Sequence, residues 1–226
     1  MTVTEEPSIS NLTGAARKPS TMLRAIVLVA VVILAAVAGA VVGRVSAGST
    51  PGDDSVDAGF ARDMSTHHSQ AVEMAILVAE RSSSTEIKVL AYDIALTQQE
   101  QIGRMKGWLV SWHLSPTGSR PPMAWMSGHA GHGGPQMSLL PDGRMPGMAS
   151  QADMARLRSL TGRPAEVLFL RLMVVHHRAG ITMAEYAAQH ADKADIRELA
   201  DAMAAGQTSE IQVLNGYLRD RGAPPA

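Results

Sequence analysis

Histidine and methionine recur together, at helical spacing, at two places in the chain. Residues three or four positions apart lie side by side on a helix, so each set presents imidazole and thioether groups on neighbouring surface positions. The first set is Met64, His67, His68 and Met74, and the second set is Met173, His176, His177 and Met183. Spacing alone does not decide which histidine of each pair points inward.

These side chains are chemically suited to a soft metal ion. Imidazole and thioether together favour Cu(I), and Ag(I) is chemically similar. The chain has 14 Met and no Cys, so Met is its one soft ligand. Carboxylates near the two sets are few, which disfavours Ca²⁺ and Mg²⁺, whereas zinc bound by the histidines stays an alternative. The sequence therefore predicts a metal site with copper as the leading ion.

A structural role is the alternative for the same residues. Methionine at helical spacing often fills a core, and buried histidines are usually hydrogen-bonded. Each His pair would then bond Glu210, Gln101 or the backbone across the bundle.

A second candidate metal site lies in a segment rich in glycine and proline. Residues 114–150 contain seven Gly and six Pro, which predicts an extended or mobile loop. Histidine and methionine in such a loop could wrap an ion weakly, or could reflect composition alone. The candidates for this secondary site are Met123, Met126, His129 and His132, with Met137, Met145 and Met148 nearby.

The two His/Met sets belong to an internal repeat. His176 follows His67 by 109 residues, and the same offset pairs Gln98 with Gln207 and Leu109 with Leu218. The offset persists through two successive helices, so the repeated unit is a helical hairpin. Two such hairpins can bury their apolar faces against each other, which predicts an all-α four-helix bundle with a pseudo-two-fold axis.

Local signals place the helices of this bundle. Serines at 82–84 separate the first two helices, and Pro164 is tolerated in the first turn of the third. The expected helices are 56–82, 84 or 85 to 113, 152–160, 163–191, and a last one that starts at Asp192 or Asp195 and ends at Arg221.

The N-terminal part predicts a membrane anchor. Residues 25–43 carry no charge and are almost all apolar; as a helix they would span roughly 28 Å, about the thickness of a bilayer core. Arg17, Lys18 and Arg24 precede this run, which places the N-terminus in the cytoplasm and the domain outside. We expect a disordered cytoplasmic tail (1–21), a single transmembrane helix (22–45), a linker (46–55) and the bundle (56–221). Cleavage as a signal peptide near Ala47, giving a secreted protein, is the alternative.

The paired motifs resemble those of DUF305, a bacterial family of unknown function with a ferritin-like helical bundle. The resemblance is carried by Met64-x-x-His67-His68-x-x-Ala71-x-x-Met74-Ala75, by Met173-x-x-His176-His177-x-x-Gly180-x-x-Met183-Ala184, and by Gln207-x-x-Glu210-Ile211-x-x-Leu214-x-x-Tyr217-Leu218. The resemblance to DUF305 covers about residues 56–218, except for the loop at 114–150. The first copy departs from the pattern because Gln101 stands where the second has Glu210. Some relatives are exported copper-binding proteins, so the resemblance implies a copper role.

Signatures of enzymes and of nucleic-acid binding are missing from the sequence. No Glu-x-x-His or Gly-x-Ser-x-Gly occurs, and no phosphate loop is found. A net charge of −1 gives no basic surface for phosphates. We expect a non-enzymatic, exported, membrane-anchored protein that buffers or sequesters Cu(I). The alternatives are a tethered structural or interaction bundle and, as a third hypothesis, a metal-dependent redox enzyme; the protein partner is not predicted.

Overall fold

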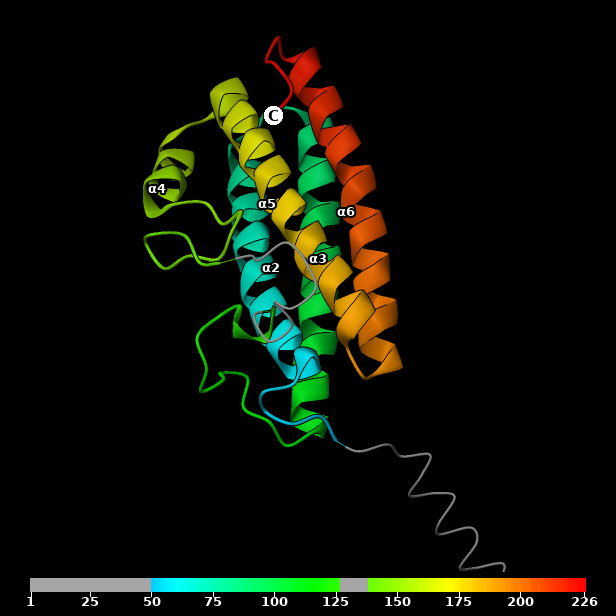
Figure 1. Ribbon diagram of the computed structural model, residues 1–226. Helices are drawn as coiled ribbons and strands as arrows, with labels where there is room; N and C mark the ends of the chain where they lie inside the picture. Colours follow the sequence, from blue (N-terminus) through cyan, green and yellow to red (C-terminus); the bar gives the residue numbers. More distant parts are fainter. Residues whose placement is uncertain (1–49, 127–137) are drawn as a thin grey trace, which may run out of the picture. The chain divides into compact units, whose positions relative to one another are not determined.

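The computed structural model describes residues 50–126 and 138–226, which belong to one compact unit whose regular elements are all helices (Figure 1). The prediction of an all-α helical bundle is confirmed. The helices are α2 (Val56–Arg81), α3 (Thr85–Ser111), the 3₁₀ turn η1 (Ala124–Met126), α4 (Gln151–Ser159), α5 (Gly162–His190) and α6 (Ala194–Asp220).

Several predicted features lie outside the described residues. They are the tail (1–21), the transmembrane segment (22–45), the first part of the linker, and His129, His132 and Met137 of the loop. Of the helices described, only α5 is long and apolar enough to cross a membrane. Its buried residues pack in the bundle, as expected for a core helix.

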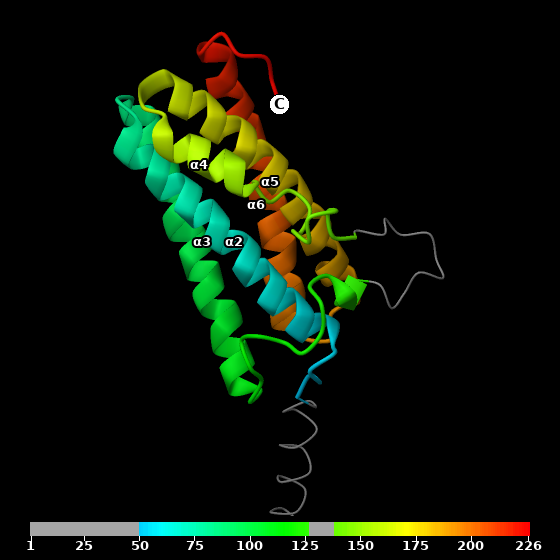
Figure 2. The same cartoon turned by 90° about the vertical axis from the view of Figure 1, so that its left-hand side faces the viewer.

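The four long helices form two hairpins, as the repeat predicts. Helix α2 pairs with α3, and α5 pairs with α6, while the two hairpins meet mainly through α2 and α5 (Figures 1 and 2). Ser84 caps α3 by accepting a hydrogen bond from the backbone N–H of Ile87 (3.3 Å). The short serine turn therefore ends one helix and begins the next where the sequence indicated.

A carboxylate near the start of each hairpin contacts the turn of the other hairpin. Asp57 on α2 accepts hydrogen bonds from the backbone N–H groups of Asp192 (3.1 Å) and Lys193 (2.8 Å), just before α6. Its repeat equivalent on α5, Glu166, accepts from the hydroxyl of Ser82 (2.6 Å), in the turn between α2 and α3. These two contacts join the hairpins at opposite ends of the bundle.

The Asp57 contact corrects the predicted start of the last helix. Asp192 and Asp195 were expected there, but α6 begins at Ala194 after Lys193, which makes no side-chain capping bond. Asp57 instead holds the two residues that precede α6, by accepting hydrogen bonds from their backbone N–H groups. Sequence-local capping rules could not identify this partner.

The core consists of two hydrophobic clusters toward opposite ends of the bundle. The predicted methionines divide between them: Met64 and Met183 belong to the first cluster, and Met74 and Met173 belong to the second. Met64 and Met74 flank the histidines on α2, as Met173 and Met183 do on α5. The four buried histidines therefore lie between the two clusters.

The described parts of the 114–150 segment contain only the short turn η1 and are held against the bundle by specific contacts, so the mobility of this loop stays a prediction. The side-chain amide of Gln70 exchanges two hydrogen bonds with the backbone of Ala149 (2.7 and 3.0 Å). Gly147, with φ of +78°, lies so close to α5 that an added Cβ would be 2.4 Å from the Cβ of Ala179. Only glycine fits this backbone conformation and this approach without strain.

Candidate metal centre

Four buried histidines form the centre of the molecule. The side chains of His67 and His68 on α2, and of His176 and His177 on α5, are all at most 1% exposed. The ring centroids of His67 and His176 are 3.6 Å apart, with the ring planes tilted by 31°. Repeat-equivalent histidines therefore meet across the pseudo-two-fold axis, as predicted. We call these four residues the histidine layer.

Three of the four rings use their Nε2 atom in a hydrogen bond. His68 Nε2 lies 2.8 Å from the side-chain oxygen of Gln101, and His177 Nε2 lies 2.6 Å from a carboxylate oxygen of Glu210. His176 Nε2 lies 3.0 Å from the backbone oxygen of His67. Two of these bonds lie within a hairpin and one crosses between hairpins. The partners Gln101, Glu210 and the backbone are those that a structural role predicts from the sequence.

The same bonds leave nitrogen lone pairs without a donor. The three partner atoms are carbonyl or carboxylate oxygens, which accept hydrogen bonds, so each neutral ring must carry its proton on Nε2. The Nδ1 atoms of the neutral rings of His68 and His176 are then unprotonated, and, like Nδ1 of His177, they are buried without a hydrogen-bond partner. Buried polar atoms of this kind are rare and need an explanation.

His67 is the least satisfied member of the layer. Neither of its ring nitrogens has a partner of normal hydrogen-bond geometry. Burial lowers the pKa of His67 to about 3, with smaller contributions from His68 and His177, while the backbone of Pro146 acts in the opposite direction. The ring is therefore neutral at ordinary pH, with a lone pair in the protein interior.

Burial also keeps the neighbouring rings neutral. It lowers the pKa of His68 to about 3, although its bond to Gln101 opposes this change. It lowers the pKa of His176 well below the usual value, and the other three histidines add to the effect. Neutral imidazole is the form that binds metal, so protons do not compete for these nitrogens near neutral pH.

Two glutamines extend the polar layer between the hairpins. Gln98 on α3 and its repeat equivalent Gln207 on α6 are 3% and 5% exposed. Both amide atoms of Gln98 and the oxygen of Gln207 have no hydrogen-bond partner. A Cβ added to Gly180 would lie 2.5 Å from the Gln207 oxygen, so glycine leaves room for this amide against α5. The repeat pairs these glutamines, but sequence reasoning assigned them no role.

The donor set suits a soft ion, although its atoms are not arranged around a single point. Among residues 50–126 and 138–226, no group of three or more His, Asp or Glu side chains is placed to hold a metal ion together. The available donors are neutral imidazole nitrogens, with thioethers in the clusters on either side, and these fit Cu(I) or Ag(I) better than a hard cation. The role of Met64, Met74, Met173 and Met183 as ligands stays a prediction.

The described loop residues cover this centre from one side. A Cβ added at Gly147 would lie 3.3 Å from the Cα of His176, so the loop crosses α5 at the histidine layer. Met123, Met126 and Met145 are buried in the same cluster as Met64. These three methionines thus belong to the core, and the secondary metal site stays a prediction.

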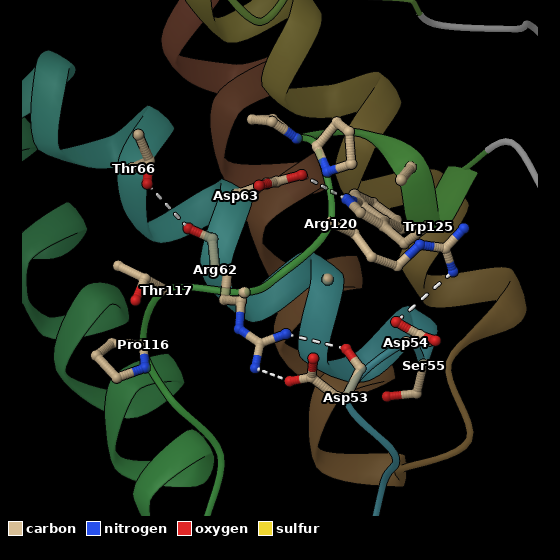
Figure 3. A pocket seen from close by; sticks show the side chains of 15 residues that line it. Asp53, Asp54, Ser55, Arg62, Asp63, Thr66, Pro116, Thr117, Arg120 and Trp125 are labelled. Carbon is tan, nitrogen blue, oxygen red and sulfur yellow. Dashed lines mark hydrogen bonds and ion pairs between the residues drawn. The ribbon is translucent and has the colours of Figure 1, made fainter.

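The pocket in Figure 3 has charged walls whose members pair with one another. It has a volume of about 250 Å³ and lies between α2 and residues 116–125. Arg62 bonds Asp53 (2.5 Å) and the backbone oxygen of Ser115 (2.9 Å). Asp63 accepts hydrogen bonds from the Trp125 indole (2.8 Å) and the Met123 backbone (2.6 Å), and burial raises its pKa. These bonds fix the beginning of the loop on α2.

Comparisons with known proteins agree with this architecture. Residues 57–218 match the family model described as "Domain of unknown function (DUF305)". A DUF305 protein of Streptomyces coelicolor that is thought to be secreted is 44% identical, with a TM-score of 0.69, over 77% of this chain and 99% of its own. A DUF305 fragment from Deinococcus radiodurans is 29% identical, with a TM-score of 0.59, over 76% and 99%.

A third solved structure, CopM in a Cu(II)-bound form, is 25% identical with a TM-score of 0.51, over 74% of this chain and 97% of its own. CopM has also been solved with Cu(I), at 22% identity, and that likeness concerns the fold alone. No curated protein matches the chain. The repeated His–His hairpins and the family match together place this chain in the DUF305 family.

Proposed function

We propose that this protein binds Cu(I) at the histidine layer and serves in copper homeostasis, as a buffer or store rather than as an enzyme. The observation that carries the proposal is the set of buried imidazole nitrogens without a hydrogen-bond donor. An unsatisfied buried acceptor costs about 1–3 kcal/mol, and an ion that accepts its lone pair would remove that cost. The bound forms of CopM support copper as the ion, with Ag(I) as a chemical analogue.

The partners of the histidines support ligation through Nδ1. A ligating histidine usually donates its other ring N–H to a carboxylate or carbonyl, which fixes the tautomer and orients the ring. Glu210, Gln101 and the His67 carbonyl fill this role for three of the rings. We propose that two of these nitrogens and a thioether bind Cu(I), which requires the side chains to rearrange, because the donors do not surround a single point among the described residues.

We further propose that the domain acts outside the cytoplasmic membrane, tethered by the apolar segment 25–43. The S. coelicolor relative, which is thought to be secreted, supports export. The absence of cysteine is compatible with an oxidising compartment, where thioether and imidazole remain usable as ligands.

Competition titration with a chromophoric Cu(I) chelator, without oxygen, tests the proposal on residues 50–226. The two solved DUF305 structures have chains of nearly the same length as residues 50–226, so this unit can be studied alone. We expect tight binding by the wild type and at least about tenfold weaker binding by His67→Ala/His176→Ala, with helicity retained. The affinity for Ag(I) should likewise be higher in the wild type than in His67→Ala/His176→Ala.

Matched variants separate ligands from core packing. His113→Asn changes an exposed histidine at a position of positive φ, which asparagine tolerates, and should leave the affinity unchanged. Met64→Leu/Met183→Leu should weaken binding more than Met105→Leu/Met203→Leu, although all four methionines lie in the same cluster. Equal Cu(I) affinity in the wild type and His67→Ala/His176→Ala would reject the site and leave a structural bundle.

A further inference from the structure

The outer face of α3 carries a line of exposed apolar side chains. Val89, Tyr92, Leu96 and Val110 are 54%, 56%, 70% and 70% exposed. At 100° per residue they fall within one narrow arc, on the side of α3 opposite its buried residues. Helix α3 lies at the edge of the bundle in Figure 2. Scattered exposed apolar residues are ordinary, whereas several on one face of a single helix indicate an interaction surface.

Two glycines complete the same line between Leu96 and Val110. Gly103 and Gly107 are exposed, and a Cβ added to either would meet no atom within 4 Å. Glycine inside a helix costs about 1 kcal/mol relative to alanine, and packing within this bundle gives no reason for it here. The two glycines make a flat strip on which another helix can approach closely.

Helix α6 provides an internal comparison, because it occupies the equivalent place in the second hairpin. At the positions that match the line, α6 has polar or small residues, although the fold around them is the same. They are Glu198, Asp201, Ala205, Gln212, Gly216 and Arg219. The bundle itself therefore does not require an apolar outer face on α3.

We propose that α3 pairs with α3 of a second copy of this chain, in antiparallel orientation about a two-fold axis between Gln99 and Glu100. Positions equally distant from that axis face each other. Leu96 then lies opposite Gly103 of the other copy, and Tyr92 lies opposite Gly107. Val89 lies opposite Val110, so two large side chains of each copy meet a glycine and the other two meet each other, and the surface is complementary to itself, as a two-fold interface requires.

The charges beside the line fit the same arrangement. Asp93 and Arg104 lie on one flank of α3, and the two-fold axis places Asp93 of one copy within a turn of Arg104 of the other. Asp93 makes no ion pair among the residues that the structure describes, and Arg104 pairs only loosely with Glu100, at 3.8 Å. Two new ion pairs would therefore form per dimer.

The size of this surface indicates a weak dimer. One face of a helix of this length covers roughly 300 Å² per copy, compared with about 800 Å² in stable interfaces. We therefore expect dissociation constants in the micromolar range or weaker, which become significant when copies are concentrated on a shared membrane surface.

Sedimentation equilibrium of residues 50–226 at rising concentration tests the proposal. The wild type should show a monomer–dimer equilibrium. Val89→Glu/Tyr92→Asp/Leu96→Ala, which places the equivalent α6 residues on α3, should remain monomeric with unchanged helicity. Ile76→Asp/Val213→Glu changes apolar residues that are 47% exposed on α2 and α6, and it should dimerise like the wild type.

Two further measurements test self-association through α3 even if the triple variant of α3 is unstable. Asp93→Arg and Arg104→Asp should each weaken self-association, and a mixture of the two should associate again because the opposite charges then face each other. The chain has no cysteine, so Gln99→Cys should form a disulfide between copies, whereas its α6 equivalent Thr208→Cys should not. A wild type that stays monomeric at millimolar concentration, or equal cross-linking at both positions, would overturn the proposal.

Discussion

Individual histidines of the central layer differ in what their nitrogens contact. His68, His176 and His177 each have one nitrogen in a hydrogen bond, whereas both nitrogens of His67 lack a partner. His67 also stacks against His176 at the pseudo-two-fold axis. It is therefore the residue whose environment would change most when an ion or a water molecule enters the layer.

The lowered pKa values predict loss of stability in mild acid. In the unfolded chain a histidine has a pKa near 6.5, whereas in the fold His67 and His68 have pKa values of about 3 and that of His176 is also low. Below pH 6.5 the unfolded state therefore binds more protons, and the free energy of unfolding falls as the pH falls toward 3. Three such groups give a slope of at most about 4 kcal/mol per pH unit.

Urea unfolding of the metal-free protein between pH 7.5 and 4.5 measures this slope, and the part above about pH 5.5 lies clear of the range where most carboxylates titrate. His68→Gln should remove about a third of the slope, because one buried titrating group is lost. His113→Asn should leave it unchanged, because that histidine is exposed. A free energy of unfolding that stays constant down to pH 4.5 would mean that the rings are not buried in neutral form.

At the scale of secondary-structure elements, the ends of helices are tied to other helices. Asp57 on α2 supports the first turn of α6, and Glu166 on α5 bonds Ser82 and also the Arg221 side chain (2.6 Å). The loop segment 144–149 is tied to α2 through Gln70 and fits α5 through Gly147. These contacts hold the two hairpins in register around the histidine layer.

Removal of the Asp57 carboxylate tests the first of these ties. Asp57→Ala leaves two backbone N–H groups without their acceptor, and it should lower the free energy of unfolding by about 1–2 kcal/mol, as for loss of a helix cap. Asp57→Asn keeps one acceptor and should cost less. Asp195→Ala, in the exposed first turn of α6, serves as the control in urea unfolding; an equal loss there would contradict the assigned role.

A pair of glycines separates backbone strain from close packing in the loop. Gly143 and Gly147 have nearly equal positive φ, +81° and +78°, but only at Gly147 would an added Cβ collide with α5. Gly143→Ala should cost about 1 kcal/mol from strain alone. Gly147→Ala should cost about 1–3 kcal/mol more and should speed cleavage near residue 147 by a protease. Equal effects in both variants would show that the loop does not rest on α5.

In the whole molecule, the duplication is preserved in the core and relaxed elsewhere. His67 and His176 meet across the pseudo-two-fold axis, equivalent methionines occupy matching places in the two opposite clusters, and Asp57 and Glu166 make equivalent contacts. The symmetry is broken where Gln101 stands opposite Glu210, and on the outer faces of α3 and α6. One half of the histidine layer therefore has a carboxylate that the other half lacks, so the two halves should not bind an ion equally.

The sequence by itself determined the hairpins and the pairing of their residues. Helical spacing and a constant offset of 109 residues depend only on the order of the chain, so they identified the helices, the repeat and the approach of equivalent histidines. The structure then showed that His67 and His176 are the pair that meets. The resemblance of the doubled motif to DUF305 was likewise available from sequence. Each of these features is local, or follows from one symmetry relation.

Only the tertiary structure decided which nitrogen of each histidine is left without a partner. It also decided that Asp57 caps a helix more than a hundred residues away, that Gly147 lies on α5, and that the methionines divide between two clusters. These features depend on side-chain direction and on contacts between segments distant in sequence. Residue spacing gives the face of a helix but not the atom that a neighbouring helix presents to it, so such contacts emerge only when the hairpins pack together.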